Sequence, residues 1–194
     1  MKWPYLLAIA LPAALLLSAQ DEPGADAGQQ RPSAPPGEVV AAAVADYRAG
    51  KYEAALVALR SELAARGDLV APEVRLNASL CALRLLHSRD AEELIAPLAD
   101  DEQWAPQAAF LLGLASSQHA ERAVIAAKLA DAEPMAWAMA SRAIQGAELQ
   151  FRRAVALQPE WPEAVRNLER TLLRRVEIEA ERAAAKTPDA KKED

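Results

Sequence analysis

The stretch that decides the fold runs from Ala147 to Glu169 and reads AELQFRRAVALQPEWPEAVRNLE. Its small and aromatic apolar residues recur at i, i+4 and i+7, which is the spacing of one helix face: Ala147, Phe151 and Ala154. Pro159 ends this helix, because its ring fixes φ and it has no N–H to donate. Pro162 stands where a first helical turn tolerates proline, so a new helix is expected to begin there. The stretch therefore predicts two helices joined by a short turn.

This order of small residue, aromatic, small residue, proline and new helix resembles the second half of a tetratricopeptide repeat (TPR). A second match lies upstream, in the pattern Tyr47-x-x-Gly50-x-Tyr52-x-x-Ala55, which resembles the turn of such a repeat. Gly50 can take the positive φ that ends a helix. We expect the helix after this turn to run to about Arg66 and to end at Gly67. The resemblance implies an architecture and not a reaction.

A second, degenerate repeat is expected over about residues 72–99. Pro72 opens a helix whose leucines are expected to be buried: Leu76, Leu80, Leu83 and Leu86. We place the turn at residues 88–90 and a short helix over residues 91–98. This alignment puts Arg89 where the family usually has glycine and Leu94 where it usually has alanine. Arg89 lies 39 positions after Gly50, against a family period of about 34, which predicts a longer loop near residues 67–70.

Two interpretations remain open for the third repeat. Pro106 opens a helix, and helical periodicity continues without Gly or Pro from residue 115 to residue 133, before a helix over residues 135–157. Either one hairpin has both helices lengthened by about three turns, or an extra short helix pair is inserted between two halves. The final helix should cover the third hairpin with a narrow apolar stripe: Leu168, Leu172 and Val176. The predicted fold is all-α, a TPR-like right-handed solenoid of about three hairpins, the last lengthened, with a C-terminal capping helix.

Composition and motifs exclude several classes of function. Apolar residues make up 52% of the 194 residues but aromatics only 5%, so the core should consist of many close contacts between alanine-rich helices. The net charge of -6 argues against a nucleic-acid partner. Cys81 is the single cysteine, and neither His87 nor His119 has a second ligand type at metal spacing. We predict no catalytic residue, no cofactor and no metal site, and expect a protein that is not an enzyme.

The two ends of the chain are expected to lie outside the repeat domain. Residues 1–19 resemble a signal peptide, with Lys2, an apolar run over residues 6–17 and small residues for cleavage after Ala19. The alternative is an uncleaved N-terminal anchor, through which residues 3–19 would associate with a membrane. Residues 20–37 are rich in Pro, Gly and polar residues and are expected to form a disordered linker. The helical domain is expected over residues 38–176, followed by a charged helix end and disordered tail over residues 177–194.

A TPR array would present a concave face made by the first helix of each hairpin. By analogy with the family, we predict a partner-binding groove at seven positions on this face: Tyr47, Arg48, Leu83, His87, Gln107, Phe110 and Leu114. The competing interpretation is that many of these residues are simply core. The groove is apolar, so we expect it to take an amphipathic helix or an apolar extended segment, from a partner or from the chain's own C-terminal helix.

The predicted location and function follow from the export signal and the repeats together. The ending from Pro162 to Glu169 is similar to that of bacterial envelope TPR proteins that accompany von Willebrand factor A-domain proteins in aerotolerance-type operons. The resemblance implies a scaffold or adaptor for envelope proteins, with a von Willebrand factor A-domain membrane protein as a possible partner. We expect the protein to be periplasmic or secreted, or else anchored to the inner membrane and facing the periplasm. The alternative function is an accessory or regulatory subunit of an envelope enzyme or a cell-wall assembly complex.

Overall fold

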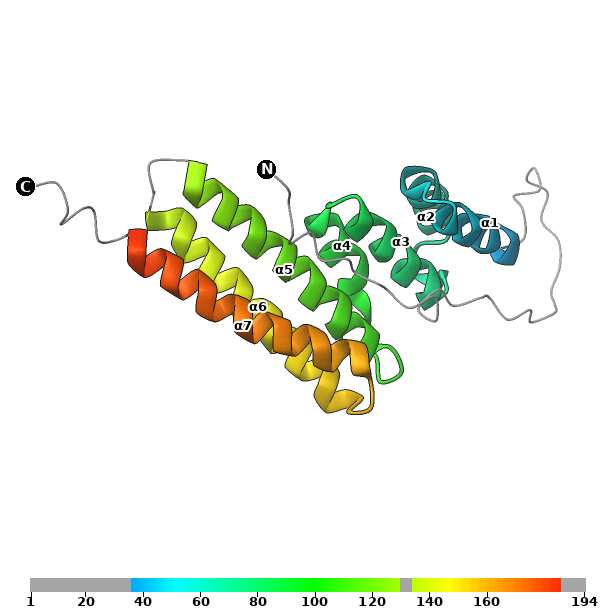
Figure 1. Cartoon of the computed structure of the whole chain (residues 1–194). Helices are drawn as coiled ribbons and strands as arrows, with labels where there is room; N and C mark the ends of the chain where they lie inside the picture. The colour runs from blue at the N-terminus through cyan, green and yellow to red at the C-terminus, as the bar shows by residue number, and fades with distance from the viewer. Residues whose placement is uncertain (1–35, 130–133, 186–194) are drawn as a thin grey trace, which may run out of the picture. The chain divides into compact units, whose positions relative to one another are not determined.

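The computed structural model describes residues 36–129 and 134–185, which form helices and turns with no strand among them. This confirms the predicted all-α class. The predictions for residues 1–19, for most of the linker and for the C-terminal tail lie outside the described residues. The α-helices, labelled in Figure 1, are α1 (Pro36–Arg48), α2 (Tyr52–Arg66), α3 (Pro72–Arg84), α4 (Ser88–Ile95), α5 (Ala105–Leu129), α6 (Pro134–Leu157) and α7 (Pro162–Ala185). Two short 3-10 helices, η2 (Gly67–Leu69) and η3 (Ala96–Leu98), follow α2 and α4.

The chain divides into two compact units, residues 1–77 and residues 78–194, and the division falls inside α3. In the first unit, α1 and α2 form a hairpin whose buried residues include Val40, Ala43 and Val44 of α1 and Ala55, Leu56 and Leu59 of α2. Gly50 has φ 77, as its place in the predicted turn requires. The rings of Tyr47 and Tyr52 meet edge to face across this turn, with centroids 5.1 Å apart. Gly67, with φ 56, caps α2 at the predicted position.

The turn between α3 and α4 repeats the hydrogen bonds of the turn between α1 and α2. In the first turn Gly50 N–H donates to Tyr47 O at 3.0 Å and Lys51 N–H to Asp46 O at 2.9 Å. In the second, Leu86 N–H donates to Leu83 O at 3.1 Å and His87 N–H to Ala82 O at 2.8 Å. Leu86 has φ 62 and is the one described residue other than glycine with a positive φ. Leu86 therefore occupies the position of Gly50, 36 residues further along the chain.

This register corrects three predictions for the second hairpin. The turn lies before Ser88 and not at residues 88–90, because α4 already begins at Ser88. Ala91, and not Leu94, is the small buried residue that corresponds to Ala55, and each of these alanines donates its N–H to the residue just before its helix. Leu86 is 51% exposed and not buried, because the left-handed backbone at this position turns its side chain off the helix face.

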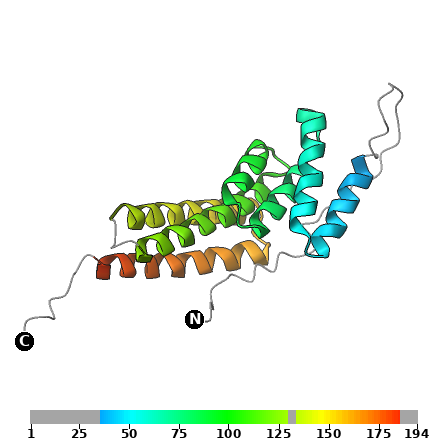
Figure 2. The ribbon, with the colours of Figure 1, turned by 90° about the horizontal axis from the view of Figure 1, so that it is seen from above.

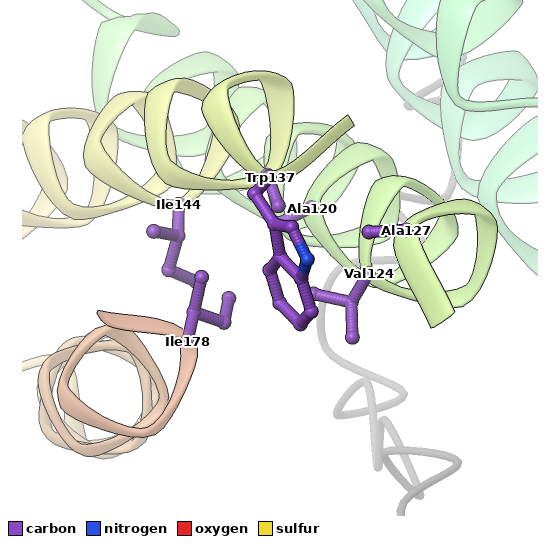
Figure 3. Close-up of a cluster of buried hydrophobic side chains, with 7 residues drawn as sticks. Ala120, Val124, Ala127, Trp137, Ile144 and Ile178 are labelled. Carbon is purple, nitrogen blue, oxygen red and sulfur yellow. The ribbon is translucent and has the colours of Figure 1, made fainter. Parts of the chain in front are cut away.

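The third hairpin consists of two unbroken helices, α5 with 25 residues and α6 with 24. Of the two interpretations left open, the structure therefore has the lengthened hairpin and no inserted helix pair in the described residues. In both views α5, α6 and α7 run side by side (Figures 1 and 2). Their outer half is held by a cluster of buried residues: Ala120, Val124, Ala127, Trp137, Ala140, Ile144 and Ile178. In Figure 3, the ring of Trp137 points toward Val124, and Ile144 faces Ile178 of α7.

Helix α7 packs through a different stripe from the predicted one. Its buried residues are Ala164, Thr171 and Ile178, which are spaced seven residues apart. Leu168 and Leu172 are only half-buried, and Val176 is 60% exposed, so the prediction for Val176 was wrong. A small residue and a threonine provide the close contacts, and these side chains carry little hydrophobic signal in the sequence. The helix also continues past Val176 to Ala185, with Ile178 fully buried.

The inner half of the third hairpin is centred on three aromatic rings. Phe110 of α5 meets Phe151 of α6 edge to face at a centroid distance of 5.7 Å and stacks on Trp161 at 4.5 Å. Trp161 therefore packs on Phe110 at the start of α7. Gly113 makes room for this arrangement, since a Cβ added there would lie 2.7–2.9 Å from ring carbons of Phe151. The ring of Phe151 is buried and cannot move aside.

Glycine at position 86 should stabilise the second unit. Leu86 has the steric strain of a positive φ, and only about half of its side chain is buried. We expect Leu86→Gly to raise the free energy of unfolding by about 0.5–1 kcal/mol, with a smaller gain for Leu86→Asn. The matched control is Leu85→Gly, which has no positive φ to relieve and should destabilise the protein. Urea denaturation followed by circular dichroism measures all three, and a destabilised Leu86→Gly would contradict the reading of the turn.

Alanine at position 113 should destabilise the protein even though alanine is the better helix former. The clash with Phe151 should cost about 1–3 kcal/mol, which outweighs a gain in helix propensity of about 1 kcal/mol. Gly146→Ala is the matched control in α6, because its Cβ would meet nothing closer than Ser116 Oγ at 3.7 Å. We expect Gly146→Ala to be neutral or stabilising and Phe151→Leu to reduce the cost of Gly113→Ala in the double variant. Equal stabilisation by both glycine replacements in thermal unfolding would refute the close contact.

Candidate partner-binding surface

The structure separates the seven predicted groove residues by burial. Leu83, Phe110 and Leu114 are each no more than 2% exposed. Phe110 packs on Phe151 and Trp161, so its ring belongs to the core of the second unit. Burial thus favours the core interpretation for these three residues, and a partner cannot reach their side chains in this fold.

The remaining four predicted positions keep some exposed surface. Tyr47 and Gln107 are half-buried, whereas Arg48 and His87 are exposed. Tyr47 and Arg48 lie in the first unit, at the end of α1, and Tyr47 packs against Tyr52. His87 and Gln107 lie in the second unit, where His87 precedes α4 and its Nδ1 is 3.9 Å from Asp90 Oδ2. The four side chains are thus divided between the two units.

One face of the α5–α6 hairpin is covered by α7, and ion pairs join the three helices. Arg174 of α7 donates to both carboxylate oxygens of Glu121 of α5, at 2.6 and 3.0 Å. It also reaches Glu177 at 2.9 Å and Glu181 at 3.4 Å, and Lys128 of α5 closes the group at 2.9 Å from Glu181. Hydrogen bonding by Glu121 raises the pKa of Arg174. Burial acts to raise the pKa of Glu181, but Lys128 and Arg174 outweigh it and hold this pKa below its usual value.

A buried carboxylate lies on the same covered face. The side chain of Glu148 in α6 is only 4% exposed and contacts Arg175 of α7 at 2.5 Å and Arg152 of its own helix at 2.6 Å. A buried carboxylate without such partners would be strongly destabilising, so the two guanidinium groups compensate its desolvation. Arg174 and Arg175 of α7 therefore pair with carboxylates of both helices of the hairpin.

The opposite face of the outer α5–α6 hairpin has a shallow hollow of ≈ 380 Å³. Its lining is mainly alanine and methionine, with two basic side chains at the rim: His119, Arg122, Ala123, Ala126, Met139 and Ala143. Arg122 and Ala126 are exposed, and Met139 is 59% exposed. Sequence reasoning missed this surface, because alanines with helical spacing look the same whether a neighbouring helix covers them or not.

Cys81 is buried, and burial raises the pKa of its thiol to about 12, which fits a small core residue. Within residues 36–129 and 134–185, no group of three or more His, Cys, Asp or Glu side chains could hold a metal ion. Among the helices of that part of the chain, none combines the length and the apolar character that a membrane span needs.

Comparisons of the chain with protein-family models, curated proteins and solved structures gave no significant match.

The ion pairs between α7 and the hairpin predict an acid-sensitive contact. Because the pKa of Glu181 is lower in the folded state than in the unfolded chain, its contribution is present above about pH 4.5 and is lost as the pH falls further. Arg174→Gln should lower the free energy of unfolding by about 1 kcal/mol at pH 7 and flatten its decline below pH 4.5. The control is Arg89→Gln, which removes an ion pair exposed on both sides and should change stability by less than about 0.5 kcal/mol. Urea titrations from pH 7 to pH 3 that show the same profile for both variants would contradict this account.

Proposed function

We propose that the protein is an exported TPR-like scaffold or adaptor that binds partner proteins in the bacterial cell envelope. The observation that carries the proposal is the recurrence of one helix–turn–helix unit. The turns at Gly50 and Leu86 share their backbone hydrogen bonds and their positive φ. Repeats of this kind stack into extended surfaces on which other proteins bind.

A second recurrence supports the assignment to the TPR class. The family places a large apolar residue four positions after a small one in its second helix. The chain has this pair three times, and all six side chains are buried: Ala55 with Leu59, Ala91 with Ile95, and Ala147 with Phe151. Each small residue lets the second helix approach its neighbour, and each large residue fills the space beyond it.

The envelope location rests on the sequence of residues 1–19 and on the resemblance of residues 162–169 to the TPR partners of von Willebrand factor A-domain proteins. We propose that the chain crosses the inner membrane by means of this segment and acts on its outer side. A membrane protein with a von Willebrand factor A domain is one proposed partner. Mass spectrometry of the mature N-terminus would decide between cleavage after Ala19 and an uncleaved anchor.

Proximity labelling in the native cell tests this function directly. A labelling enzyme fused to the C-terminus of the full chain should enrich a reproducible set of envelope proteins. The control is the same exported enzyme fused to Phe151→Asp, which buries a charge in the aromatic core and should unfold the second unit. Labelling of cytoplasmic proteins only, or the same set of proteins with the unfolded control, would refute the proposal.

A further inference from the structure

The hollow on the α5–α6 hairpin adjoins a surface that already binds an acidic helix. Helix α4 has the sequence SRDAEELI, with three carboxylates and one arginine, and packs against α5. Its Glu92 Oε1 lies 3.4 Å from His119 Nε2 of α5. The buried side chains of α4 at this contact are small or aliphatic, namely Ser88, Ala91 and Ile95. This contact shows which kind of helix the α5 surface accepts.

The same surface continues past His119 along the lengthened part of the hairpin. Arg122 comes three residues after His119, and Ala126 comes seven residues after His119. All three therefore lie on one face of α5. Met139 and Ala143 of α6 complete the hollow. Among the residues that the structure describes, Arg122 has no ion-pair partner, in contrast to His119 beside it.

In contrast to the hairpin face under α7, the lining of the hollow contains no carboxylate. Under α7, Glu121 and Glu148 of the hairpin pair with Arg174 and Arg175 of α7, and Lys128 of the hairpin pairs with Glu181 of α7. Here, the one permanently charged side chain in the lining of the hollow is Arg122. A helix that docks here must therefore be acidic where it meets Arg122 and must have apolar side chains toward the alanines.

We propose that this uncovered face, from His119 to the outer end of the α5–α6 hairpin, docks an acidic amphipathic helix of a partner protein. The helix continues the position of α4 along α5, places a carboxylate on Arg122 and inserts aliphatic side chains into the hollow beside Ala126 and Met139. This inference rests on the proposed scaffold function and names the surface and the class of partner that serve it.

Two synthetic helices of opposite charge test the proposal on the full-length protein. Both have roughly 18 residues, so that a helix can form, and the same leucine and alanine face; one has glutamate on its flanks and the other lysine. Fluorescence anisotropy should show binding of the acidic peptide only. Arg122→Glu should weaken that binding at least about fivefold and favour the lysine peptide. Arg170→Glu is the matched control, since Arg170 is an exposed arginine of α7, which covers the other face of the hairpin, and it should leave both affinities unchanged.

Several outcomes would overturn the proposal. These are equal binding of the two peptides, an equal loss in both arginine variants, or no binding of the acidic peptide at about 1 mM. A protein that is dimeric by light scattering and becomes monomeric in Arg122→Glu would assign the face to a second copy of the chain. If the proteins labelled in the native cell are the same for wild type and Arg122→Glu, the scaffold function stands and this docking site fails. Thermal unfolding of each variant checks that its fold is intact.

Discussion

The close approach of α5 and α6 is the contact on which the second unit depends. It requires a residue without a side chain at Gly113, because the ring of Phe151 occupies the space where a Cβ would lie. Phe151 in turn fixes Phe110, and Phe110 fixes Trp161 at the start of α7. Further along, alanines at 120, 127 and 140 keep the two helices together and leave room for Trp137 between them. The core between α5 and α6 needs few large side chains, because the two helix backbones lie close together and leave little space to fill.

Residues with unambiguous backbone roles made much of the fold predictable. Gly50 takes its predicted positive φ, Gly67 ends α2 as predicted, and Pro72 and Pro162 begin the helices expected of them. The turn after α3 was predicted three residues too late. Its left-handed residue is Leu86, and leucine has no preference for a positive φ that would mark the turn in the sequence. Here the hydrogen bonds of the repeated turn override local preference, as happens where the surrounding structure determines the backbone. The position of the turn, and with it the register of the second hairpin, therefore could not be predicted from the sequence.

The candidate surface was harder to predict than the fold, because burial depends on which elements become neighbours. Leu83, Phe110 and Leu114 have the spacing of a helix face, but that spacing does not say whether core or partner covers the face. For the same reason the alanines of α5 gave no sign that one side of the lengthened hairpin would be covered by α7 and the other would remain open. The charged side chains, and not the apolar ones, distinguish the covered face of the hairpin from the open face. The covered face holds carboxylates that pair with arginines of α7, whereas the open face presents Arg122 beside α4, a helix with three carboxylates.

In the second unit, α5 and α6 form one continuous lengthened hairpin. Native-state hydrogen exchange resolved along the chain tests it most directly, because each amide reports the free energy of opening its own segment. We predict that amides of residues 116–127 and 137–150 exchange as slowly as those of residues 108–115 and 151–155, through unfolding of the whole unit. Fast exchange confined to the outer segments, or a break in protection inside either helix, would show that the lengthened part is not one packed hairpin and would contradict the account.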